Sequence, residues 1–191
     1  MNIKEKDALN NLVKNALYGI HMGYYSAPLS IEAAQRDNER PGFLIISNYN
    51  PNNLTHTENI VNGSKHELVN REFSLDGGEF RKLLGKLIHQ DGALLVGKER
   101  EKGKVYRVGA RLKNHNVPLK VPDDKEEWEA LGFSHEVGTR HINALYASTV
   151  MPGTSIWTLS GKTGTIRRYE EGRIVQSTLK PEIFGLEERV A

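Results

Sequence analysis

The order of apolar and polar positions along the chain predicts helices that alternate with short strands. Apolar residues recur at helical spacing over residues 9–20, and Gly23 is the expected end of this first helix. Residues 80–88 place apolar side chains at i, i+3, i+4, i+7 and i+8, which predicts an amphipathic helix of about three turns. Residues 43–46 are a continuous apolar run, which predicts a buried strand closed by a loop at 48–53.

The second half of the chain predicts strands that pair locally. Strands at 93–96 and 105–108 flank a charged turn, and strands at 165–169 and 173–176 flank a turn at 170–172. The other expected elements are a short strand at 68–73, a helix capped by Asp123 with Glu126, a helix beginning near Arg140, a strand at 155–159 and a terminal helix at 181–190. Together they predict an α/β fold with a central mixed β-sheet flanked by helices.

Length and composition indicate one domain with additions at both ends. The chain has 191 residues, of which 38% are hydrophobic, and this is enough for one hydrophobic core. We expect an amino-terminal helical extension at 1–40, a central domain at 41–178 and a carboxy-terminal helix at 179–191.

Charge and cysteine content exclude several classes of function. The net charge is +2 and basic residues are interspersed with acidic ones, which argues against DNA, RNA or an anionic membrane as partner. The absence of cysteine excludes disulfides, thiol nucleophiles and thiolate metal sites, and it is typical of a reducing compartment. No apolar run approaches the roughly 18 residues of a membrane span. We therefore expect a soluble, cytoplasmic protein.

The segment Gly138-Thr139-Arg140-His141 carries the first candidate site. It opens a helical pattern, so backbone amides, a guanidinium and an imidazole are expected at one helix N-terminus, which is a favourable place for an anion. Positive side chains at this end of a helix oppose the helix dipole by roughly 0.3–1 kcal/mol when exposed. That cost favours an anionic partner over a purely solvated role.

Asp91-Gly92 carries the second candidate site. The aspartate lies between the helix at 80–88 and the strand at 93–96, beside a glycine that lets a ligand approach the backbone. Asp-Gly is also a common turn dipeptide, so a turn role for Asp91 stays open. A phosphate site combined with a turn carboxylate indicates nucleotide chemistry.

Two other motifs fail on spacing. Gly161-Lys162-Thr163 has the end of a P-loop sequence, but Ile156 stands where the first glycine belongs and a hairpin follows in place of a helix. His135 and His141 are six residues apart, whereas a helical zinc site needs two histidines four residues apart.

Four short motifs resemble, in order and spacing, the diadenylate cyclase domain of the DisA N-terminal type. They are Asp91-Gly92-Ala93, Gly109-Ala110-Arg111-Leu112, Gly138-Thr139-Arg140-His141, and Ser160 with Thr163-Gly164-Thr165-Ile166 and the later Gly172. The resemblance covers roughly residues 43–174. It implies a central mixed sheet wrapped by helices, which binds ATP and joins two ATP molecules into cyclic di-AMP with release of pyrophosphate.

The resemblance also implies roles for individual residues. Asp91 is the expected catalytic residue, which activates the ribose 3′-hydroxyl, and the Arg-His motif is expected to hold the phosphates. The predicted nucleotide-binding set is Gly92, Ala93, Gly109, Leu112, Gly138, Thr139, Arg140, His141 and Ser160, together with Lys162, which stands where the family has an acidic residue. Magnesium or manganese is the expected cofactor. ATP or another adenine nucleotide, and a second copy of the chain in a homodimer or higher homo-oligomer, are the expected partners.

The chain departs from the family at three places. Gln90 replaces a histidine, Ile142 replaces a second arginine, and Gly161-Lys162 replaces acidic residues that help to hold the metal. Phosphoryl transfer depends on positioning and charge neutralisation, so lost metal ligands threaten rate more than binding. Two functions stay open, a diadenylate cyclase and a non-catalytic nucleotide sensor or interaction module on the same fold. A hydrolase or transferase unrelated to this family requires the ordered motifs to be coincidence.

Overall fold

The computed structural model of the chain describes residues 3–25, 42–49, 57–59, 73–75, 78–87, 92–97, 104–112, 122–180 and 182. Several sequence predictions lie outside these residues: the loop at 50–53, most of the strand at 68–73, Gln90 and Asp91, the turn at 98–103, and the terminal helix apart from Glu182. Among the described helices none is both long enough and apolar enough to cross a membrane.

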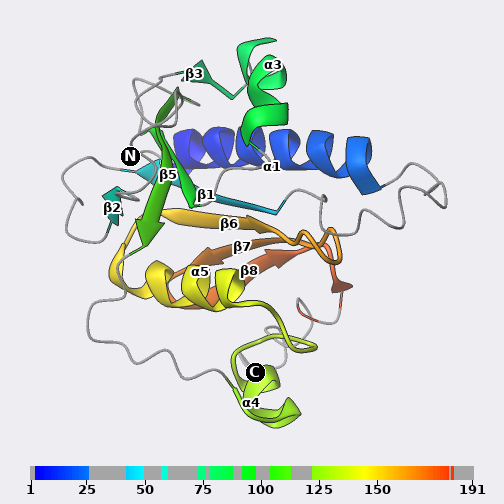
Figure 1. The fold of residues 1–191 in the computed structure, drawn as a ribbon. Coiled ribbons are helices and arrows are strands. Elements are labelled where there is room, and N and C mark those ends of the chain that lie inside the picture. The colour runs from blue at the N-terminus through cyan, green and yellow to red at the C-terminus, as the bar shows by residue number, and fades with distance from the viewer. Residues whose placement is uncertain are drawn as a thin grey trace, which may run out of the picture.

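The described residues form four helices and one eight-stranded sheet (Figure 1). The helices are α1 (Ile3–Tyr25), α3 (Gly78–Leu87), α4 (Lys125–Ala130) and α5 (Thr139–Val150). The strands are β1 (Phe43–Tyr49), β2 (Thr57–Asn59), β3 (Phe73–Ser74), β4 (Ala93–Gly97), β5 (Lys104–Leu112), β6 (Ser155–Leu159), β7 (Ile166–Glu170) and β8 (Arg173–Ser177).

The sheet is mixed. Its strand order is β2-β5-β4-β1-β6-β7-β8, and β3 pairs with β5 beside this path. Strands β1 and β4 are parallel, and the other described pairs are antiparallel. The fold is therefore α/β with a central mixed sheet flanked by helices, which confirms the fold class predicted from the sequence.

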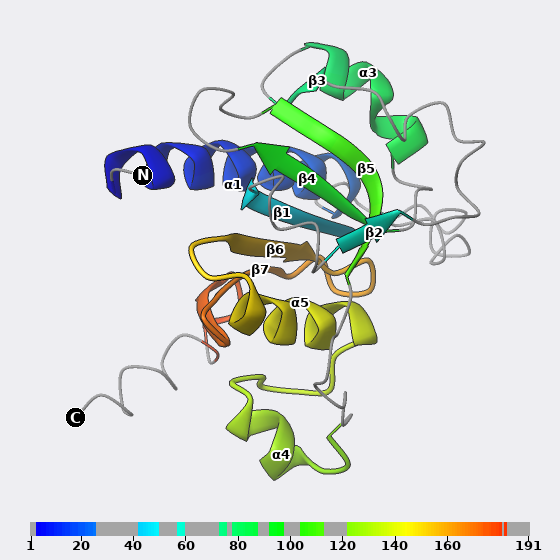
Figure 2. The same cartoon turned by 90° about the vertical axis from the view of Figure 1, so that its left-hand side faces the viewer.

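Helices cover both faces of the sheet (Figures 1 and 2). Side chains alternate along β1, so Phe43 and Ile45 join the core beneath α1 and α3, whereas Leu44 and Ile46 join the core beneath α5 and α4. Every residue of β1 is buried, as expected of a central strand covered on both faces. The result is a three-layer arrangement with the sheet between two separate cores.

Several predicted boundaries are wrong, and β5, for example, continues past residue 108 to Leu112. Helix α1 continues through Gly23 to Tyr25, because one glycine inside a helix costs only about 1 kcal/mol relative to alanine. Strand β1 continues past residue 46 to Tyr49, and it includes Asn48, which adopts a positive φ of 59°. Asparagine tolerates this conformation better than most residues do.

The cap of α4 lies one residue later than predicted. Asp124, not Asp123, is the N-cap, and its side chain accepts a hydrogen bond of 2.9 Å from the amide of Glu127. The amide of Asp123 in turn donates to the Glu127 carboxylate at 3.0 Å. The pair of bonds resembles the expected capping box, with Asp124 as the cap. The return bond from Glu127 goes to the amide of Asp123, the residue before the cap.

Polar contacts fix α1 on the sheet. The Asn10 side chain accepts hydrogen bonds from Ser47 Oγ at 3.1 Å and from Trp157 Nε1 at 3.3 Å, all within the buried interior. Lys6 pairs with Glu170 at 2.7 Å. Because buried polar groups need partners, these bonds select one register of the helix on the sheet.

Candidate functional site

The predicted site residues that the structure describes lie toward one end of the sheet. Ala93 at the start of β4 pairs with Ala110 near the end of β5, and Phe43 at the start of β1 pairs with Leu159 at the end of β6. Strand β1 lies between β4 and β6, so the start of β4 and the end of β6 are two strand spacings apart, about 10 Å. The topology thus gathers sequence motifs that are more than sixty residues apart.

A pocket of about 100 Å³ lies at this end, beside the N-terminus of α5. It is lined by His135, Glu136, Val137, Gly138, His141, Ser160, Lys162, Thr163 and Arg167. Four of these residues, Gly138, His141, Ser160 and Lys162, belong to the set predicted from the sequence. Pockets that enclose a drug-sized ligand measure about 300–1,000 Å³, so this pocket accommodates a group the size of a phosphate.

Gly138 is the N-cap of α5. Its backbone is extended, with φ −70° and ψ 161°, and it offers no side chain to cap the first amides of the helix. Amide groups of the first turn have no helical acceptor and carry the positive end of the helix dipole. The amide of His141 donates to the carbonyl of Gly138 at 3.0 Å, so a glycine at this position leaves the amides of Thr139 and Arg140 accessible to an anion.

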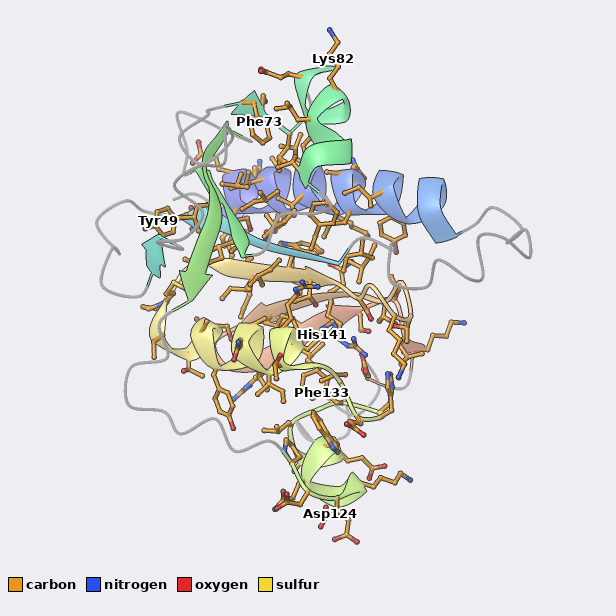
Figure 3. The ribbon with its side chains drawn as sticks, in the orientation of Figure 1. Tyr49, Phe73, Lys82, Asp124, Phe133 and His141 are labelled. Atoms are coloured by element: carbon orange, nitrogen blue, oxygen red, sulfur yellow. The ribbon has the colours of Figure 1, made fainter. Side chains whose placement is uncertain are left out.

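His141 projects from α5 toward the sheet and is only 5% exposed (Figure 3). Its Nδ1 lies 2.9 Å from the hydroxyl of Tyr169 and 2.9 Å from that of Thr158. Burial, followed by the charges of Arg167, Arg140 and His135, lowers the pKa of His141 to about 3. The imidazole is therefore neutral at physiological pH and contributes a hydrogen bond, not a charge.

The turn between β6 and β7 presents Lys162. Ser160 Oγ accepts from the amide of Thr163 at 3.1 Å, and the amide of Gly164 donates to the carbonyl of Ser160 at 2.9 Å. Gly164 has a φ of +71°, which favours glycine. Lys162 lies exposed on this turn, and no carboxylate of a described residue pairs with its ammonium group.

Arg140 lies beside the pocket and is not part of its lining. A Cβ atom added to Gly42 would stand 2.0 Å from Arg140 Nη1 and 3.3 Å from the amide nitrogen of Gly161. The guanidinium therefore lies over the start of β1, between the strand ends that carry the two groups of motifs. Among the described residues it has no hydrogen-bond or ion-pair partner.

The other predicted residues lie apart from the pocket. Thr139 is exposed in the first turn of α5 and is not among the lining residues. Gly92 has a φ of +94°, consistent with the predicted tight turn, and precedes Ala93 at the start of β4. Gly109 and Leu112 lie on β5, beyond β4 from the pocket. Asp91 lies outside the described residues.

Sequence reasoning missed Arg167, a buried cation in the pocket wall. Arg167 is 1% exposed, and its Nε and Nη2 donate to the two carboxylate oxygens of Glu182 at 2.7 and 2.6 Å. The alternation of the strand at 165–169 could have placed Arg167 on the same face as the apolar Tyr169. No such pattern predicted the burial of Glu182, because its segment was expected only to form a terminal helix.

The described residues do not assemble the metal site that the resemblance implies. No group of three or more metal-ligating carboxylates or histidines occurs among them. Glu136 is the carboxylate in the pocket lining, and Mg²⁺ usually needs one or two carboxylates together with phosphate oxygens.

Comparisons with known proteins find similarity in structure alone. No protein-family model matches the sequence, and no curated protein matches it. A crystal structure described as a hypothetical membrane spanning protein from Bacillus cereus is similar over 86% of this chain and 61% of that one, with 15% identity and a TM-score of 0.49. A double mutant of DacA from Staphylococcus aureus is similar over 96% of this chain and 95% of that one, with 17% identity and a TM-score of 0.48. Both TM-scores lie below 0.5.

Proposed function

We propose that this protein binds an adenine nucleotide with its phosphates at the N-terminus of α5, and that it is a diadenylate cyclase. One observation carries the proposal. Gly138, His141 and Ser160 come from two separate motifs of the resemblance, and they line one pocket together with Lys162. Their meeting in space is what a shared ligand requires.

The charges at this end of the sheet favour a phosphate chain. Lys162 and Arg140 lack anionic partners among the described residues, and uncapped amides of α5 lie beside them. Burial raises the pKa of Tyr169, so its phenol keeps its proton and can donate to Nδ1 of His141. When the hydroxyl of Tyr169 or Thr158 donates to Nδ1, the single proton of the neutral imidazole lies on Nε2, where it can donate to a phosphate oxygen.

The pocket is too small to hold a whole nucleotide. A space of about 100 Å³ takes one phosphate group, so the nucleoside must lie outside it. Arg140 lies over the start of β1, on the way from the pocket to Gly92. We infer that the triphosphate crosses β1 and brings the ribose toward Asp91, which precedes Gly92 in the chain.

In the cyclase, Asp91 takes the proton of one ribose 3′-hydroxyl. The freed oxygen attacks the α-phosphate of the second ATP and pyrophosphate leaves. The reciprocal step closes the ring of cyclic di-AMP. The second candidate function is a nucleotide sensor without turnover, and Lys162 in the pocket favours it because a lysine cannot bridge phosphate oxygens as a metal ion does. The expected metal, Mg²⁺ or Mn²⁺, would arrive with the ATP phosphates.

Replacing Arg140 with Ala is expected to weaken ATP binding about ten- to hundredfold. A charge-assisted hydrogen bond contributes about 1.5–3 kcal/mol, which corresponds to this loss. Isothermal titration calorimetry measures the change. Gly42→Ala should weaken binding in the same direction with little loss of stability, because its methyl group displaces the flexible end of Arg140.

Arg173→Ala is the matched control for that titration. Arg173 is an exposed arginine at the start of β8, at the opposite end of the sheet from the pocket. Its loss should leave ATP affinity unchanged. Equal ATP binding by wild type and Arg140→Ala would show that the phosphates bind elsewhere.

A cyclase of this kind is expected to work as a pair of chains. Each chain supplies one Asp91 and one phosphate site, so two ATP molecules can react reciprocally only when two sites face each other. The rate of cyclic di-AMP formation should then rise with the square of protein concentration when the protein is dilute. A strictly linear rise, from protein shown to be monomeric by analytical ultracentrifugation, would exclude this mechanism.

A further inference from the structure

Arg167 is an unusual residue for the wall of a pocket. Its side chain is 1% exposed, yet it carries a permanent charge and is among the residues that line the pocket. The guanidinium carbon of Arg167 lies 5.6 Å from the centroid of the Phe133 ring, which helps to hold the side chain in place. Because Arg167 is fully buried beside this site, the hydrogen-bond partners of its guanidinium decide how much of its charge a ligand meets.

Glu182 takes only part of the hydrogen-bonding capacity of Arg167. A guanidinium has five N–H donors, and two of them go to Glu182, through Nε and Nη2. Within the described part of the chain, Nη1 has no hydrogen-bond acceptor. Nη1 is therefore the part of this side chain that is left for a ligand in the pocket.

Glu182 is itself held by other groups. Ser177 Oγ donates to its Oε2 at 2.7 Å, and Ser134 Oγ donates to its Oε1 at 3.2 Å. The same Ser134 hydroxyl lies 2.9 Å from Nδ1 of His135, which lines the pocket. The carboxylate of Glu182 is thus linked to the pocket lining directly through Arg167, and also through Ser134 to His135.

We propose that Arg167 is an anion-binding residue of this pocket and that Glu182 sets the affinity by sharing its guanidinium with the bound phosphate. The proposal rests on the proposed function, since it adds a cation to the same phosphate site. A carboxylate on two of the five donors neutralises much of the charge that a phosphate would otherwise meet. Weakening the contact with Glu182 shifts that charge toward the ligand.

Three variants of the full chain test the proposal, with inorganic pyrophosphate and ATP as probes in calorimetry. Glu182→Gln keeps the shape of the side chain and removes its charge, so pyrophosphate should bind about tenfold more tightly. Ser177→Ala removes one of the bonds that hold Glu182 and should tighten binding by less. The double variant Arg167→Met with Glu182→Met replaces the buried pair by apolar groups, which folded proteins often tolerate. It should bind pyrophosphate about tenfold more weakly than wild type.

The results separate this proposal from the proposed function. If wild type binds pyrophosphate and the double variant binds it equally well, Arg167 is structural and the proposal is overturned. If Glu182→Gln does not fold, the double variant alone decides. If wild type binds pyrophosphate but not ATP, the nucleotide function is wrong while the role of Arg167 is still decided by the same variants. If wild type binds neither probe, both fail.

Discussion

Replacing Asp91 with Asn is expected to abolish the formation of cyclic di-AMP while ATP affinity stays equal or becomes tighter. A general base contributes about 10²–10⁴-fold to rate and little to ground-state binding. A carboxylate beside a triphosphate also repels it, and asparagine removes that charge while keeping size and turn preference. Mass spectrometry of the product, after incubation with ATP and Mg²⁺ or Mn²⁺, measures the first effect and calorimetry the second.

Lys162→Glu tests the same assignment from the opposite direction. It restores an acidic residue in the pocket, where the resemblance expects a metal ligand, and turnover should rise if the remaining groups are in place. A wild-type protein and a Lys162→Glu variant that both bind ATP and both make no cyclic dinucleotide would leave the sensor as the function.

Acidification from pH 8 to pH 5 is expected to lower the free energy of unfolding by about 2 kcal/mol through His141 alone. Its pKa is about 3 in the folded protein and 6.5 when exposed, so between these values the unfolded chain binds a proton that the native protein does not. The contribution of His141 to the free energy of unfolding is fully present above pH 6.5. Below pH 6.5 it falls by about 1.4 kcal/mol per pH unit. Urea unfolding at each pH measures the change.

His141→Gln is the control for the pH series. Glutamine can still meet the hydroxyls of Tyr169 and Thr158 but does not titrate, so its stability should lose this pH dependence. The pKa values of Glu170 and Glu182 are also lowered from 4.5. The stability that these two carboxylates contribute is therefore lost only at a more acid pH. Between pH 8 and pH 5 the titration of His141 can be measured apart from theirs. A similar drop in both proteins would assign the effect to another group.

Most of the fold could be predicted from the sequence because its elements are strongly patterned. Strand β6 has the predicted bounds, and the hairpins β4–β5 and β7–β8 form as expected. The errors lie where local preference yields to context. Gly23 does not end α1, and the capping box of α4 uses the second of two adjacent aspartates.

The candidate site could be predicted in part for a different reason. Gly138 and Ser160 both belong to the set predicted from the sequence, and they lie near each other because β6 and α5 pack together. The neutral protonation state of His141 could not be predicted, because its burial depends on Tyr169 and Thr158, which lie on two different strands. Pairing of Arg167 with Glu182 likewise depends on how the chain returns after β8.

The fixing of α1 on the sheet has a consequence for how the chain folds. Asn10 finds its partners at Ser47 and Trp157, and Lys6 finds its partner at Glu170, 164 positions along the chain. Contacts between such distant segments give a high contact order, and high contact order slows folding because long loops must close first. During synthesis, α1 can therefore form its contacts with Trp157 and Glu170 only after nearly the whole chain has emerged.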